Sequence, residues 1–263
     1  MAGKTYNVID YQAVGDGVTD DTQVDGNITA PNYIWTTEMT NLITFHAISN
    51  LVFHGTGTID GRAPGNSPNT DGIVMQDCQN VQITGCIIGT GDDCIAVLTN
   101  TSNVNISRIR CGPGHGISIG SLGKDNTNAA VERIHIHDST IYNALTGARI
   151  KTWQGGSGYA RNITFERISM ANVTTPIVID QTYNTLQVST DVAISNIVFR
   201  NIHGTSTHEV AIKLDCSAIV PCKELIFDEI TLTRIGVNQT VFAASQNAYG
   251  MTNGTIIPSL HLG

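Results

Sequence analysis

The sequence predicts an all-β fold, a single-stranded right-handed parallel β-helix. Three observations predict it: the composition favours strands and turns, a short phrase recurs seven times, and no helical periodicity accompanies that phrase. The chain has 263 residues, which is the length of one large domain. We therefore expect residues 1–263 to form a single β-helix domain.

The composition is biased toward the residues of strands and tight turns. The chain contains 33 Ile, 32 Thr and 22 Asn. Ile and Thr favour the pleated, half-buried surface of a strand, and Asn tolerates the backbone conformations of turns. Alanine, glutamate and lysine are sparse, which argues against a helix bundle, a coiled coil and a doubly wound α/β fold.

The recurring phrase alternates apolar and polar residues, then breaks for two residues before a further Ile. The alternation is typical of a strand with one buried face, and the break indicates a sharp bend. Successive copies begin 30, 23, 30, 29, 34 and 28 residues apart, a spacing that fits coils that stack and bury a shared face. The copies begin at Asn50, Asn80, Asn103, Arg133, Asn162, Asn196 and Glu224.

The Asn that opens most copies has two interpretations. Its side-chain amides could form a ladder in the interior of the stack, or Asn could occur there only because it suits a bend. The residues alone leave both interpretations open.

Polar segments interrupt the repeat at intervals close to one coil. They are Asn69-Thr70-Asp71, Gly91-Asp92-Asp93-Cys94, Gly114-His115-Gly116 and Arg149-Ile150-Lys151, with Tyr183 as a fifth candidate. The steps from Asp71 to Asp92, His115, Arg149 and Tyr183 are 21, 23, 34 and 34 residues. Residues one coil apart lie about 4.8 Å apart along the stack, so we expect these side chains on one wall.

Such a wall has the groups that glycoside hydrolysis requires. Three clustered carboxylates raise one another's pKa, so we expect one protonated acid beside ionised partners. Arg149 and Lys151 alternate across Ile150 and share a face of the strand. A pair of cations beside the acids suits an anionic substrate.

At these residues the sequence resembles the polygalacturonases, the pectin-hydrolysing β-helical enzymes of glycoside hydrolase family 28, and it is most similar to plant members. The likeness is strong from about Thr58 to Thr233. Relative to the family, the chain looks shortened in its N-terminal third. The motifs that carry the resemblance are Ser67-Pro68-Asn69-Thr70-Asp71-Gly72, Gly91-Asp92-Asp93-Cys94, the segment from Cys111-Gly112-Pro113-Gly114-His115-Gly116 to Gly123, and Arg149-Ile150-Lys151-Thr152-Trp153.

The resemblance implies inverting hydrolysis of α-1,4 bonds between galacturonic acids, more in the endo than in the exo mode. Asp92 would be the general acid, and Asp71 and Asp93 would activate water on the opposite face of the sugar. His115 would tune the acid or hold the substrate. Four further residues would bind or orient the substrate: Asn69, Arg149, Lys151 and Tyr183.

The resemblance also implies two disulfides, Cys94–Cys111 and Cys216–Cys222, with Cys78 and Cys86 left unassigned. From the residues alone, six cysteines allow 15 pairings. Cysteine usage and frequent glycosylation sequons favour a secreted glycoprotein, and the resemblance implies that it acts in the cell wall. Met1-Ala2-Gly3-Lys4 lacks the apolar region of a signal peptide. The sequons begin at Asn27, Asn100, Asn105, Asn162, Asn172, Asn238 and Asn253.

Charge and hydropathy exclude several partners. The net charge of −8 lacks the basic footprint of a nucleic-acid-binding protein, and no apolar run is long enough to span a membrane. We expect a monomer that binds pectin and needs no cofactor or metal.

Two alternatives remain. Clustered Asp residues could be calcium ligands of a β-helical pectate lyase that acts by β-elimination, although the Gly-His-Gly and Arg-Ile-Lys motifs argue against it. The shortened N-terminal third could leave a catalytically impaired or inactive pectin-binding protein.

Overall fold

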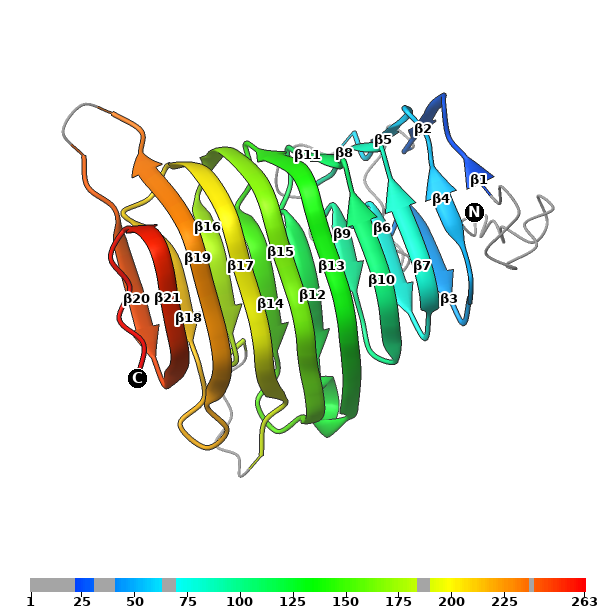
Figure 1. The fold of residues 1–263 in the computed structure, drawn as a ribbon. Coiled ribbons are helices and arrows are strands. Elements are labelled where there is room, and N and C mark those ends of the chain that lie inside the picture. Colours follow the sequence, from blue (N-terminus) through cyan, green and yellow to red (C-terminus); the bar gives the residue numbers. More distant parts are fainter. Residues whose placement is uncertain (1–21, 31–40, 63–69, 184–189, 237–238) are drawn as a thin grey trace.

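The computed structural model describes residues 22–30, 41–62, 70–183, 190–236 and 239–263. Over these residues the chain is a right-handed parallel β-helix, as predicted. Figure 1 shows the strands stacked coil upon coil along one axis, from β1 at the N-terminal end to β20 and β21 at the C-terminal end. The described pairs of strands are parallel, for example β13 with β15 and β14 with β16.

One sheet of 13 strands forms two sides of the solenoid in the described chain. The long strand β13 pairs with β10 through its first half and with β11 through its second, so the sheet bends without a break. Its strands are β1 (Thr22–Gln23), β2 (Asn27–Thr29), β4 (Val52–His54), β5 (Thr58–Asp60), β7 (Gln79–Thr84), β8 (Ile87–Gly89), β10 (Thr101–Ser107), β11 (Arg110–Cys111), β13 (Asn128–Tyr142), β15 (Ser157–Val173), β17 (Ala193–Ser206), β19 (Cys222–Arg234) and β21 (Ala248–Ile257).

The remaining side is a sheet of eight strands in the described chain. Its strands are β3 (Ile43–His46), β6 (Ile73–Gln76), β9 (Ile95–Val97), β12 (Ile117–Leu122), β14 (Thr146–Thr152), β16 (Thr175–Asp180), β18 (Val210–Asp215) and β20 (Phe242–Gln246). A short 3₁₀ turn, Lys124–Asn126, follows β12. Among the residues that the structure describes, no helix is long and apolar enough to cross a membrane.

The recurring phrase corresponds to one bent strand in each coil. The seven residues that open its copies all have left-handed backbone, with φ between 52° and 60°. Five residues later the backbone is left-handed again, for example at Arg108 (φ 54°), Asp138 (φ 50°) and Asn201 (φ 50°). Asn and Asp tolerate this conformation better than other non-glycine residues. The predicted sharp bend is therefore confirmed.

Of the two interpretations left open for the Asn, a ladder of side-chain amides is present, but it lies on the outside of the solenoid and not in its interior. The Asn80 side-chain amide donates to Asn50 at 2.8 Å, and that of Asn103 donates to Asn80 at 3.0 Å. Asn196 donates to Asn162 in the same way at 2.6 Å. These side chains are exposed, because a left-handed residue at a bend directs its side chain away from the core. The Asn therefore suits the bend and also links neighbouring coils, on the outside of the solenoid.

The core is a set of apolar rows that run along the stack. In one row Ile106, Ile136 and Phe165 occupy equivalent positions in successive coils. The row continues into Phe199 and Phe227, whose rings stack with centroids 4.9 Å apart. Each coil therefore buries its inward side chains only against its neighbours.

Candidate active site

The predicted catalytic residues lie where successive coils enter the eight-stranded sheet. Asp71 precedes β6, the pair Asp92 and Asp93 precedes β9, and His115 precedes β12. Backbone hydrogen bonds fix the alignment: Gly72 N–H donates to the Asp93 carbonyl at 2.9 Å, and His115 N–H donates to the Asp92 carbonyl at 2.7 Å. The coil spacing thus brings these residues together, as predicted.

Asp92 and His115 form a direct pair. The Nδ1 atom of His115 lies 2.8 Å from Oδ1 of Asp92, and both side chains are partly accessible to solvent. The same Asp92 oxygen accepts the backbone N–H of Asp93 at 2.9 Å. Gly116, at φ 89°, lets the chain pass against the backbone of Thr146, where a side chain would collide. Position 116, beside His115, therefore requires glycine, because any side chain there would collide with the neighbouring backbone.

Asp93 is enclosed by cations. Only 1% of its side chain is exposed. Its Oδ1 accepts from Arg149 at 2.5 Å, and its Oδ2 accepts from the Lys151 ammonium at 2.9 Å. A buried carboxylate is stabilised by such pairing and by charge-assisted hydrogen bonds. The cations that we predicted to bind substrate thus also neutralise a buried acid of the site.

Ser118 is a site residue that the sequence reasoning missed. Its hydroxyl donates to Oδ1 of Asp93 at 2.8 Å and accepts from Nε of Arg149 at 2.9 Å. The strand register pairs Ser118 with Arg149 on the outward face. The alternation of the Gly116-Ile117-Ser118-Ile119 segment could have indicated this, since Ser118 lies between two buried apolar residues.

Asp71 has the perturbed acidity that the clustering predicted for one of the carboxylates. Burial, together with the nearby charges of Asp93 and Asp92, raises its pKa from 3.8 to about 7. The charge of Lys151 opposes the rise. Asp71 therefore holds a proton up to near-neutral pH, beside a carboxylate that two cations stabilise.

Tyr183 lies next to the cations, as its spacing predicted. The Lys151 ammonium is 5.4 Å from the centre of the Tyr183 ring, which also packs edge-on against Trp153. Asn69, the remaining predicted substrate ligand, lies outside the described residues.

Comparison with known proteins places this site in a family. Residues 62–249, well over half of the chain, match the glycosyl hydrolases family 28. The chain belongs to this family. A probable polygalacturonase of Arabidopsis thaliana is 51% identical over 177 residues, which cover 65% of this chain and 39% of the relative. A polygalacturonase of Juniperus ashei is 41% identical over 234 residues, or 84% of this chain and 45% of the relative.

Solved structures share the family 28 solenoid. A polygalacturonase from Erwinia carotovora superposes with a TM-score of 0.62 at 25% identity, over 77% of this chain and 54% of that one. An exopolygalacturonase from Thermotoga maritima has the same fold, with a TM-score of 0.64 at 19% identity over 73% and 44% of the two chains. This family 28 chain spans about two-fifths of the length of the curated relatives it matches, 39% and 45% in the two cases above.

Two disulfides brace the family 28 site, with the pairing that the resemblance implied. Cys94, next to Asp93, is bonded to Cys111 at the end of β11, and Cys216 is bonded to Cys222. Cys78 and Cys86 are buried free thiols. Desolvation raises the pKa of Cys86 to about 11, so this thiol is unreactive near neutral pH.

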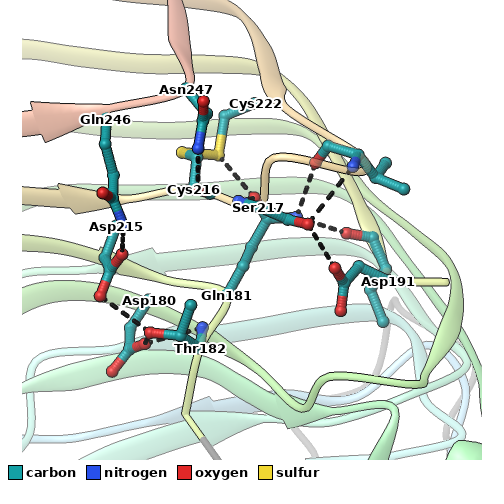
Figure 2. Close-up of a disulfide and its surroundings, with 12 residues drawn as sticks. Asp180, Gln181, Thr182, Asp191, Asp215, Cys216, Ser217, Cys222, Gln246 and Asn247 are labelled. Atoms are coloured by element: carbon teal, nitrogen blue, oxygen red, sulfur yellow. Dashed lines mark hydrogen bonds between the residues drawn. A yellow bond between two sulfur atoms is a disulfide. The ribbon is translucent and has the colours of Figure 1, made fainter. Parts of the chain in front are cut away.

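The second disulfide belongs to a polar network beside Tyr183, drawn in Figure 2. The Gln181 side chain accepts the backbone N–H of Ser217 at 2.9 Å and donates to the Val192 carbonyl at 2.9 Å. The Thr182 hydroxyl donates to Asp215 at 2.8 Å. The two residues before Tyr183 are thereby anchored to the next coil.

The carboxylates also resemble a metal site, and the calcium alternative can be tested against them. Ligand atoms of Asp92, Asp93 and His115 lie within 4.8 Å of one another. However, both oxygens of Asp93 already contact cationic side chains, Arg149 and Lys151. Calcium requires six to eight oxygen ligands, and two fixed positive charges beside Asp93 repel it. The donor set therefore does not fit calcium.

Proposed function

We propose that this chain performs the inverting hydrolysis of α-1,4 linkages between galacturonosyl residues of pectin. The observation that carries the proposal is the arrangement of three carboxylates: Asp92 paired with His115, Asp93 held by two cations, and Asp71 with a raised pKa. Inverting hydrolysis needs one carboxylic acid and one carboxylate that activates water.

In this mechanism Asp92 protonates the glycosidic oxygen. Its side chain is partly accessible to solvent, and His115 pairs with it at 2.8 Å. Asp71 and Asp93 activate the attacking water on the opposite face of the sugar. Burial and the nearby charges of Asp93 and Asp92 let Asp71 hold a proton up to about pH 7. Passage of that proton to Asp92 makes Asp92 the acid that protonates the leaving group and leaves Asp71 ionised as the base.

Arg149 and Lys151 serve the substrate as well as Asp93. Arginine has five N–H donors and lysine three, and the contacts with Asp93 and Ser118 use only some of them. The remaining donors suit the carboxylate of a galacturonosyl residue. Tyr183, exposed beside Lys151, gives that residue an aromatic surface.

We further propose endo action by a monomeric, secreted glycoprotein of the cell wall. Coils extend on both sides of the site, with β3 and β6 before it and β16 and β18 after it. A polymer can therefore continue past the cleaved bond in both directions.

A second candidate is a catalytically impaired pectin-binding chain. It is favoured by the short span of the chain, 39% to 46% of the relatives' length. Binding of oligogalacturonate without release of reducing ends would support it.

The test is release of reducing ends from polygalacturonate by the chain and by Asp92→Asn. We expect the substitution to lower kcat at least ~100-fold, the scale of general acid catalysis. Asp228→Asn, on the other sheet, is the matched control and should leave the rate unchanged. An Asp92→Asn variant with full activity would contradict the mechanism, and unsaturated products that vanish with a chelator would indicate β-elimination instead.

A further inference from the structure

A groove adjoins the reaction centre and has no role in the mechanism above. It has a volume of about 600 Å³ and begins at His115. It continues over the bends by which the following coils enter the eight-stranded sheet, past Leu145, Thr174, Thr207 and Ile235. Adjacent coils are about 4.8 Å apart, so the groove is long enough for more than one sugar residue.

The lining of this groove is uncharged. Among the described residues that line it, His115 has the only titratable side chain. The outward face of the neighbouring sheet differs, because it carries charged side chains: Arg149 and Lys151 next to the reaction centre, and Lys213, Asp180 and Asp215 in the following coils. The two surfaces beside the catalytic residues therefore suit different substrate chemistry.

Apolar and neutral polar groups share the lining. The side chains of Leu145 and Ile235 are 47% and 43% exposed. Asn172 donates to Asn143 at 3.1 Å, which leaves amide capacity for sugar hydroxyls. Thr207 and Thr174 form a similar pair at 3.2 Å.

An ionised galacturonosyl residue would lose its hydration here and gain no counter-ion, which is costly. A methyl ester has no charge to desolvate, and its methyl group can contact Leu145.

We propose that this groove is a binding site for galacturonosyl residues whose carboxylates are methyl-esterified. The inference rests on the proposed function, because it assigns the substrate class of the same cleft. It makes partly esterified pectin a substrate: ionised residues bind over Arg149 and Lys151, and esterified residues bind beyond His115.

The first test is binding, which needs no turnover. Calorimetry with a fully methyl-esterified oligogalacturonide should detect binding to the unsubstituted chain. Leu145→Lys should weaken it about tenfold, the discrimination expected when a site loses its apolar contact, and Ile235→Lys should weaken it too. Ile219→Lys is the control, because Ile219 is 54% exposed in the Cys216–Cys222 loop outside the groove.

The second test is the ratio of kcat/KM for polygalacturonate to that for highly esterified pectin. Leu145→Lys should raise this ratio, because a new cation favours ionised residues, and Ile219→Lys should not. The inference is overturned if the unsubstituted chain does not bind the esterified oligomer, or if Leu145→Lys and Ile219→Lys behave alike. Failure of the proposed function is distinct: no reducing ends would appear from polygalacturonate, whatever the binding result.

Discussion

At the residue scale, the site separates three similar carboxylates by their surroundings. Asp93 is buried between Arg149 and Lys151, whereas Asp71 is partly buried beside other acids and has a pKa near 7. Asp92 is partly accessible and pairs with His115. Burial with cations favours the charged form and burial with acids disfavours it, so one residue type can supply different roles.

Asp71 makes stability depend on pH. Its folded pKa is about 7 and its ordinary value is 3.8, so between these values the folded chain keeps a proton that the unfolded chain releases. Stability should therefore fall as pH rises through this window. Asp71→Asn should remove the fall and stabilise the chain by about 2–4 kcal/mol above the window, measured by urea unfolding across pH.

The matched control for this prediction is Asp125→Asn, an exposed carboxylate in the 3₁₀ turn. It should leave the pH dependence unchanged. A parallel pH profile for Asp71→Asn and the unsubstituted chain would contradict the assignment of the raised pKa to Asp71.

A substitution at Ser118 tests how much the side chains bonded to Asp93 contribute to stability. Ser118→Ala removes a hydrogen bond to the buried carboxylate and one from Arg149, and we expect a loss of about 1–3 kcal/mol in the free energy of unfolding. Alanine itself fits the row, since Ala96 occupies the equivalent position one coil earlier. Ser102→Ala, distant from the site, should have little effect. Unchanged stability of Ser118→Ala would contradict a stabilising role for the hydrogen bonds of the Ser118 hydroxyl with Asp93 and Arg149.

At the scale of elements, the bends determine where each strand turns. The residues that open the repeat have left-handed backbone, and several link to the next coil through side-chain amides. The two functions belong to one residue type, because Asn tolerates positive φ and carries both a donor and an acceptor.

Substitutions at Asn80 separate these two functions. Asn80 has φ 56°, accepts from Asn103 and donates to Asn50. Asn80→Gly loses only the ladder, and Asn80→Ala also strains the backbone by about 1–2 kcal/mol. In chemical denaturation the unsubstituted chain should therefore be the most stable, Asn80→Gly less stable and Asn80→Ala the least stable. Equal stability of the Gly and Ala variants would contradict a backbone role.

At the scale of the whole molecule, cohesion comes from contacts between neighbouring coils. The rings of Phe165, Phe199 and Phe227 stack in one continuous row. A coil cannot bury this face alone, so the stability of the site depends on the coils that follow it.

Phe199→Ala should therefore be severe. It opens a cavity between two stacked rings, and we expect a loss of about 3–5 kcal/mol in thermal or urea unfolding. Phe242→Ala, at an exposed position of β20, is the control and should change stability by less than ~0.5 kcal/mol. Similar losses in the two variants would contradict a continuous core through Phe199.

Composition and repeat spacing were enough to predict the architecture and the grouping of the site residues. Alternation and repeat spacing predicted the stacked coils, and the one-coil steps between Asp71, Asp92 and His115 predicted their convergence. These features are local or periodic. In a solenoid, residues that are one repeat apart in the sequence lie next to each other in space.

The interactions among the grouped residues could be read only from the folded chain. Arg149 and Lys151 reach Asp93 across 56 and 58 residues, and no repeat spacing specifies which carboxylate a cation contacts. The raised pKa of Asp71 and the outward direction of the Asn ladder are likewise properties of burial. Burial depends on the face that each side chain takes in the finished solenoid, which the neighbouring coils decide.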